Sequence, residues 1–204
     1  MKYIFYKVTK FILKPIFILI YRPTYVGRSN IPKDGAVIIA GNHTSYLDAA
    51  MMVSGPKRIV HTLAKQELFK NGLGNFFFRS MACIPVNRKS HDKNAKDEAV
   101  NVLNNGEVIG IFPEGTRNKN EKGLLPFKYG AVSFAKKTGA YIVPFAITGK
   151  YKPFKKGIKI TYGEPYKVND DLDIENEKLR NIVIKLKTKG EKDEKENRKW
   201  VSMV

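Results

Sequence analysis

Short apolar runs alternate with longer amphipathic segments from residue 36 to residue 165, and this alternation strongly constrains the fold. Apolar runs of this length are typical of buried strands, whereas the segments between them are long enough for helices. The expected strands cover 36–40, 58–64, 82–86, 107–112, 141–147 and 158–165. The expected helices cover 46–54, 66–81 (whole or broken at its glycines), 92–106, 128–139 and a last segment from about residue 170. The order predicts an α/β domain with a mixed, largely parallel sheet flanked by helices.

The N-terminal residues 3–21 are mostly apolar or aromatic but contain three lysines. As a helix they would extend about 28 Å, yet two lysines near the middle would each cost about 3 kcal/mol inside a bilayer. The spacing puts Lys7, Lys10 and Lys14 on one stripe. We therefore expect an amphipathic helix lying in the membrane interface, with its lysines facing lipid phosphates and Pro15 kinking or dividing it. A secretory signal peptide is one alternative, but the segment lacks the small-residue cleavage site of such peptides. The other alternative is a core helix of the domain whose lysines face water.

The chain is strongly basic, with 37 Lys and Arg against 19 Asp and Glu and a formal net charge of +18. Such a field favours polyanionic partners. Because no nucleic-acid-binding motif is present, we expect anionic membrane lipids and no nucleic acid as partners. One cysteine and three scattered histidines predict neither an internal disulfide nor a metal site. We divide the chain into a membrane-attachment segment (1–30), an α/β domain (31–190) and a charged, solvated or frayed tail (191–204).

Three of the expected strands end in polar clusters. "NHTSYLD" follows residues 36–40, "NRKS" follows 82–86, and "PEGTRN" follows 107–112. Each cluster alone has a simpler explanation, such as a helix cap in which Thr44 or Ser45 begins the next helix and Asp48 completes a capping box. Ligands of open α/β sheets bind outside the carboxyl ends of the strands. We therefore expect the three clusters to converge at one edge of the sheet.

Four segments in this order resemble the motifs of the glycerolipid acyltransferases: "NHTSYLD", "CIPVNR", "FPEGTR" and "IVPFAI". The resemblance covers roughly residues 35–165 and is closest to the bacterial 1-acyl-glycerol-3-phosphate (lysophosphatidic acid) acyltransferases. It implies that His43 is the catalytic base and Asp48 its partner. It assigns the phosphate of the acceptor to the second and third motifs, that is, to Arg88, Glu114, Gly115 and Arg117. Lys65 and Lys128 are weaker phosphate candidates.

The residue types suit acyl transfer from a thioester. A histidine near its usual pKa can remove the proton of an acceptor hydroxyl, and an aspartate bound to the other ring nitrogen fixes the tautomer. No G-x-S-x-G motif is present, which argues against a serine hydrolase. For Glu114 we leave three roles open: positioning Arg117, binding the acceptor, or pairing with a nearby lysine.

The resemblance implies an enzyme at the cytoplasmic face of the cell membrane that forms phosphatidic acid. The acyl donor would be acyl-CoA or acyl-carrier protein, as a co-substrate, without any cofactor. Two alternatives stay open. The acceptor can be glycerol 3-phosphate or another lysophospholipid, and the chain can be a non-catalytic basic module that binds nucleic acid or lipid.

Overall fold

The computed structural model describes residues 3–87, 92–120 and 123–201. Seven strands form one sheet in the order β1-β7-β6-β2-β5-β3-β4. Neighbouring strands are parallel except for β6 and β7, which are antiparallel. The strands are β1 (Thr24–Val26), β2 (Val37–Gly41), β3 (Val60–Lys65), β4 (Cys83–Val86), β5 (Val108–Ile111), β6 (Tyr141–Thr148) and β7 (Lys159–Tyr162). The prediction of a mixed, largely parallel sheet is confirmed.

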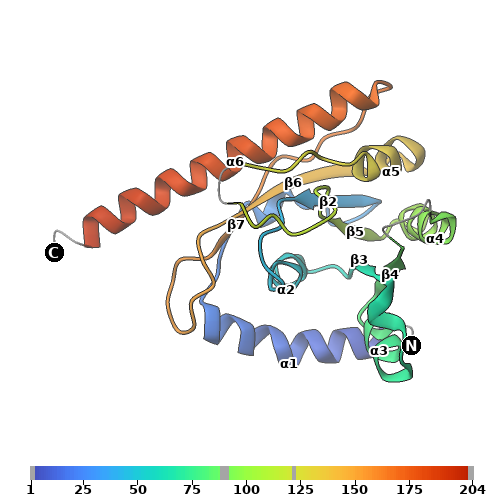
Figure 1. Ribbon diagram of the computed structural model, residues 1–204, viewed down its shortest axis with the longest axis horizontal. Helices are drawn as coiled ribbons and strands as arrows, with labels where there is room; N and C mark the ends of the chain where they lie inside the picture. The colour runs from blue at the N-terminus through green and yellow to red at the C-terminus, as the bar shows by residue number, and fades with distance from the viewer. Residues whose placement is uncertain (1–2, 88–91, 121–122, 202–204) are drawn as a thin grey trace.

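Helices cover both faces of this sheet (Figure 1). They are α1 (Ile4–Tyr21), α2 (Asp48–Ser54), α3 (Gly72–Ser80), α4 (Lys93–Asn104), α5 (Gly130–Thr138) and α6 (Leu172–Val201), with 3-10 turns η1 (Arg28–Asn30) and η2 (Gln66–Phe69). Successive residues of β2 point to opposite faces, as the pleat requires. Ile38 and Ala40 join the core under α4, α5 and α6, whereas Val37 and Ile39 join the core on the side of α1 and α2. Burial on both faces explains why this strand is apolar throughout.

Several element ends differ from the expectation. The segment 66–81 is broken, because η2 ends at Phe69 and the side chain of Asn71 begins α3 by accepting a hydrogen bond from the Gly74 amide. Of the two states expected for residues 191–204, the frayed one is wrong, because α6 continues as one helix to Val201. The side chains of residues 191–196 are exposed or half-buried, as expected of a solvated segment. Ion pairs tie this extension down: Lys187 reaches Glu191 at 2.6 Å, and Lys159 of β7 reaches Asp193 at 2.8 Å. The short strand β1, which we did not expect, pairs with β7.

The N-terminal helix is confirmed, but Lys10 does not face outward as the lysine stripe predicted. α1 runs unbroken through Pro15. Lys10 turns toward the domain, where its ammonium group donates to the carbonyl oxygens of Pro56 at 2.9 Å and Arg58 at 3.2 Å. Tyr6 on the same face is buried, and its hydroxyl accepts from the Val60 amide at 3.2 Å. Lys10 therefore faces the domain, and Lys14 lines the same side of the helix, whereas Lys7 is exposed.

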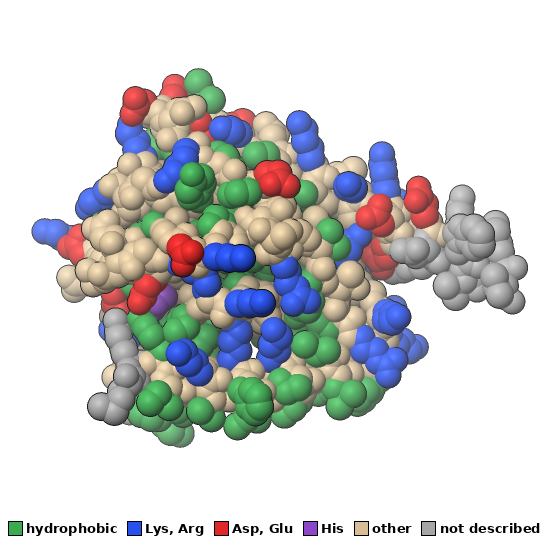
Figure 2. All heavy atoms as spheres, turned by 180° about the vertical axis from the view of Figure 1, so that it is seen from behind, with side chains coloured by type: hydrophobic (Ala, Val, Ile, Leu, Met, Phe, Trp, Pro, Cys, Tyr) green, Lys and Arg blue, Asp and Glu red, His purple; other side chains and the backbone are tan. Residues whose placement is uncertain are grey.

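The opposite face of α1 is apolar and uncovered. Its exposed side chains are Ile4, Phe5, Val8, Phe11, Ile12, Leu13, Ile16, Ile18 and Leu19. Figure 2 shows hydrophobic side chains along this edge of the molecule, with Lys and Arg side chains gathered directly above them. Within the described residues, no helix has both the length and the apolar character required to cross a bilayer.

Candidate active site

Two neighbouring strands bring the first and third sequence motifs together. β2 and β5 are parallel neighbours in which Ala40 pairs with Ile111, so both strands end at the same level of the sheet. The loops that follow are then joined by hydrogen bonds. The Asn118 amide donates to the His43 carbonyl oxygen at 2.7 Å, and the His43 amide donates to Glu114 Oε1 at 2.9 Å. The expected convergence of these two motifs is therefore present.

His43 and Asp48 form a hydrogen-bonded pair at this edge. His43 Nδ1 lies 3.0 Å from Asp48 Oδ2, so it donates to the carboxylate and the ring keeps Nε2 for another proton. The Asp48 side chain is fully buried, while that of His43 is 13% exposed. The imidazole stacks on the Phe112 ring, with centroids 4.1 Å apart and planes 17° from parallel. Stacking and hydrogen bonding together fix the orientation of the ring.

Backbone amides satisfy the buried charge of Asp48. Its Oδ2 accepts from the Thr44 amide at 2.5 Å and from the Ser45 amide at 2.7 Å. The expected cap by Thr44 or Ser45 is wrong, because α2 begins at Asp48 and no side chain caps it at Leu47. The loop folds back onto the carboxylate instead. These amide donors replace the water that the buried carboxylate has lost, and a carboxylate beside Nδ1 favours a protonated imidazole.

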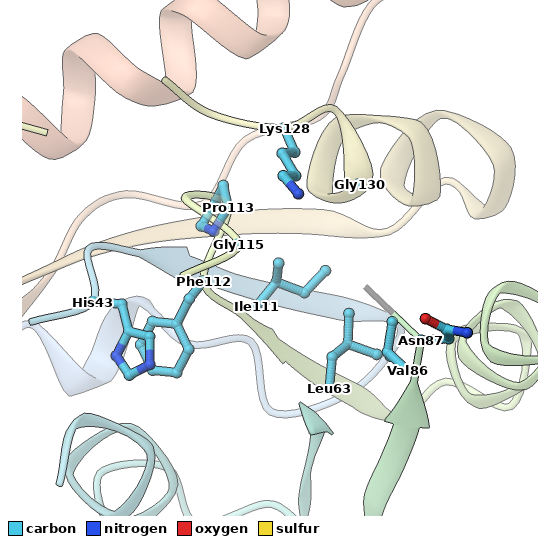
Figure 3. Close-up of a pocket in the computed structure, with 10 residues that line it drawn as sticks. All are labelled: His43, Leu63, Val86, Asn87, Ile111, Phe112, Pro113, Gly115, Lys128 and Gly130. Carbon is cyan, nitrogen blue, oxygen red and sulfur yellow. The ribbon is translucent and has the colours of Figure 1, made fainter. Parts of the chain in front are cut away.

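A pocket of about 230 Å³ opens beside His43 (Figure 3). His43 and Phe112 lie at one end of the pocket, and Asn87 lies at the other end, after β4. Lys128, just before α5, lines the pocket and points its ammonium group toward it (Figure 3). The pocket thus brings a histidine and a lysine together at the carboxyl edge of the sheet.

Glu114 and Gly115 shape the wall of this pocket. Glu114 is buried, and its second carboxylate oxygen accepts from the Leu125 amide at 2.9 Å. Among the described residues, Glu114 forms no hydrogen bond or ion pair with Arg117 or a lysine; it joins two loops. Gly115 has a φ of +69°, and a Cβ atom there would lie 2.8 Å from Cε of Lys128. The positive φ favours glycine at this position, and a side chain there would displace the end of Lys128.

The remaining candidates lie in different places. The Arg117 guanidinium lies over the Tyr46 ring, 3.4 Å from its centroid, rather than among the side chains that line the pocket. Lys65 ends β3 on the surface and pairs with Glu67 at 3.1 Å, away from the pocket lining. Arg88 lies outside the described residues, although it follows Asn87, which lines the pocket.

A second cavity, of about 460 Å³, lies between α1, α2 and α3. Apolar side chains form most of its lining, among them Phe17, Ala50 and Phe77. Lys10 also lines it, and burial, reinforced by the neighbouring charge of Lys14, lowers the pKa of Lys10 to about 8. This cavity depends on how α1 docks, so the sequence motifs gave no signal for it.

Two side chains that contact the pair were not among the expected site residues, although Phe112 is the first residue of the "FPEGTR" segment. Phe112 is the last apolar residue of the expected strand 107–112, and nothing in its type marks it as a partner of His43. Tyr151 follows β6, and its hydroxyl donates to Asp48 Oδ1 at 2.8 Å. A contact across 103 positions leaves no local pattern in the sequence.

Known proteins are similar to this chain in sequence. A family model described as Acyltransferase matches residues 22–148, more than half of the chain and all of the segment from β1 to the end of β6. The chain belongs to the acyltransferase family. The resemblance inferred from the motifs is thereby confirmed, and the match includes His43, Asp48 and Glu114.

Curated relatives of this acyltransferase carry a more specific name. A 1-acyl-sn-glycerol-3-phosphate acyltransferase of Bacillus subtilis is 35% identical over 144 residues, which are 68% of this chain and 70% of that protein. One of the same name from Borreliella burgdorferi is 37% identical over 139 residues, 67% of this chain but only 55% of that protein.

A solved structure shares the fold. The crystal structure of the 1-acyl-sn-glycerophosphate (LPA) acyltransferase PlsC from Thermotoga maritima superimposes with a TM-score of 0.71. It is 24% identical and covers 92% of this chain and 78% of that one. At this identity the likeness supports the architecture and adds nothing on the substrate.

Proposed function

We propose that this acyltransferase moves a fatty acyl chain from a thioester donor to the sn-2 hydroxyl of 1-acyl-glycerol-3-phosphate, forming phosphatidic acid. The observation that carries the proposal is the His43–Asp48 pair, 3.0 Å apart, beside a pocket that also holds Lys128. The curated names of relatives at 35% and 37% identity supply the acceptor. The donor is acyl-CoA or acyl-carrier protein, since both present the same thioester.

In this reaction His43 Nε2 takes the proton of the acceptor hydroxyl while Asp48 stabilises the imidazolium. The oxygen then attacks the thioester carbonyl carbon, a C–O bond forms, and the C–S bond breaks as the tetrahedral intermediate collapses. The proton on His43 passes to the departing sulfur. Each turnover therefore releases one free thiol and returns the histidine to its neutral form.

The phosphate of the acceptor requires cations near this pair. Lys128 supports that role by its place in the pocket, and Gly115 supports it by leaving room for the lysine. Arg117, held over the Tyr46 ring, has no carboxylate partner among the described residues and is available to an anion at the rim. We propose that Arg88, the residue after Asn87, binds the same phosphate, and this assignment rests on the motif resemblance alone.

We further propose that the protein lies on the cytoplasmic face of the cell membrane through α1. The apolar outer face of α1 is continued at one end by Phe76 of α3, whose ring lies 5.6 Å from that of Phe5, and at the other by the exposed Phe154. The cavity beneath α1 then receives an acyl chain of a lipid substrate directly from the bilayer. The net charge of +18 suits anionic lipid headgroups.

The function is tested by thiol release in detergent, with palmitoyl-CoA or palmitoyl-acyl-carrier protein and with or without lysophosphatidic acid. We expect acceptor-dependent release that His43→Ala reduces by at least about a hundredfold, the usual contribution of a general base. His61→Gln is the matched control, because His61 pairs with Glu107 away from the pocket; it should stay within about threefold of wild type.

Two results would contradict the proposal. Release with glycerol 3-phosphate but not with lysophosphatidic acid would assign a different acceptor to the same site. Equal release by wild type and His43→Ala would remove His43 from the chemistry, and with it the observation on which the proposal depends.

A further inference from the structure

The loop that follows β6 places Tyr151 against the buried carboxylate of the pair. Asp48 Oδ2 accepts from His43 and from two backbone amides, whereas Oδ1 accepts from the Tyr151 hydroxyl at 2.8 Å. The tyrosine is the side chain that holds the second oxygen. A carboxylate held at both oxygens has its plane fixed, and its plane sets the direction in which the imidazole points.

Tyr151 remains a donor throughout the working pH range. Burial raises the pKa of its phenol far above the usual value, and the negative charge of Asp48 raises it further. The other titratable groups facing this phenol from neighbouring elements are the phenols Tyr25 of β1 and Tyr21 of α1. The hydrogen bond to Asp48 therefore does not depend on the protonation of Tyr151.

The same tyrosine contacts the N-terminal helix. The Tyr151 ring lies 5.6 Å from the Tyr21 ring in an edge-to-face arrangement and 6.5 Å from the Phe17 ring. Three residues further along the loop, the Phe154 amide donates to the Ile20 carbonyl oxygen at 2.5 Å. The C-terminal end of α1 is thus joined to Asp48 through one aromatic side chain and one backbone hydrogen bond.

We propose that Tyr151 is a positioning residue that holds the Asp48 carboxylate, and through it the His43 ring, at the place where α1 docks on the domain. The inference rests on the proposed function, in which His43 is the base. It links the helix that carries the apolar face to the proton-accepting group. Displacement of the end of α1 would loosen Tyr151, free one carboxylate oxygen and misalign the imidazole.

Tyr151→Phe tests the hydrogen bond while keeping the ring. We expect kcat to fall about tenfold with KM for the acceptor changing less than about twofold, because the base is misaligned but the pocket is intact. In the plot of kcat/KM against pH, the midpoint of the acid limb should rise by about half a pH unit. A carboxylate that has lost a hydrogen-bond donor stabilises the imidazolium more strongly. A kcat within twofold of wild type, or a loss of kcat without movement of the acid limb, would overturn the proposal.

Tyr25→Phe is the matched control. It also removes a hydroxyl from a half-buried tyrosine, one that lies 2.6 Å from Ser54 Oγ and does not contact the pair. We expect its acid limb to stay at the wild-type position. A nuclear magnetic resonance titration of His43 provides the direct readout, because the chain has three histidines; an equal His43 pKa in wild type and Tyr151→Phe would overturn the proposal.

The link to α1 is tested by combining Tyr21→Ala with Tyr151→Phe. We expect Tyr21→Ala to lower kcat about threefold in the wild type and by less than about 1.5-fold in Tyr151→Phe, since both changes act through one contact. Equal losses in the two backgrounds would overturn the link. If the wild type released no thiol in response to the acceptor, the proposed function itself would fail. Failure of the positioning role and failure of the proposed function are therefore distinguishable.

Discussion

At the scale of single residues, Glu114 acts on the site through backbone amides. Its two oxygens accept from the His43 and Leu125 amides, both at 2.9 Å, and the side chain is 4% exposed. A carboxylate suits this role because both of its oxygens only accept. The loop that carries His43 is therefore held by the loop that follows β5.

Glu114→Gln should disturb that junction with little change in size. The amide nitrogen of glutamine would face a backbone N–H, so one buried donor would lose its acceptor, at a cost of about 1–3 kcal/mol in the free energy of unfolding. Chemical denaturation measures this cost, and we expect kcat to fall about tenfold with it. Glu98→Gln is the control, because the exposed Glu98 pairs with Arg79 on the surface and should change stability by less than about 1 kcal/mol. Equal stability of Glu114→Gln and wild type would show that the loops do not depend on this carboxylate.

At the scale of elements, the docking of α1 over α2 and α3 creates the apolar cavity of about 460 Å³. If this cavity receives an acyl chain, its depth limits the chain length. Ala50→Phe should fill part of it and lower kcat/KM for sixteen-carbon chains about tenfold, with about a twofold change for ten-carbon chains. Phe77→Ala should enlarge it and move the preference toward longer chains. Both shifts in chain-length preference are measured as rates with series of acyl donors and of lysophosphatidic acids that differ in chain length. If both variants kept the chain-length preference of the wild type, the cavity would be excluded as the acyl site.

At the scale of the whole molecule, the basic surface and the apolar face of α1 predict binding to anionic membranes. Phe11 is 83% exposed and Leu19 is 65% exposed, so both are free to insert. Replacing both by Asp should weaken co-sedimentation with anionic vesicles by at least about a hundredfold, because each buried side chain of this size contributes about 1.5–3 kcal/mol. Ile174→Asp is the control, since Ile174 is also 65% exposed but lies on α6. Equal vesicle binding by the double variant and by wild type would contradict attachment through α1.

The sequence by itself determined six of the seven strands and most helices, and the resemblance of its motifs pointed to the His43–Asp48 pair. Buried parallel strands must be apolar on both faces, and the polar clusters that follow them must meet at one edge, so local patterns were sufficient for these features. The match of the motifs to the acyltransferase family rested on the same local information.

Only the tertiary structure decided which way α1 faces, what Glu114 binds and what holds Asp48. As a pattern, the lysine stripe of α1 fits water, lipid phosphate or buried carbonyl groups equally well, and for Lys10 the packing against residues 56–58 decided among them. The contact of Tyr151 with Asp48 joins positions 103 residues apart. Such contacts follow from the order of strands in the sheet, which brings the end of β6 beside the end of β2, and no periodicity along the chain encodes that order.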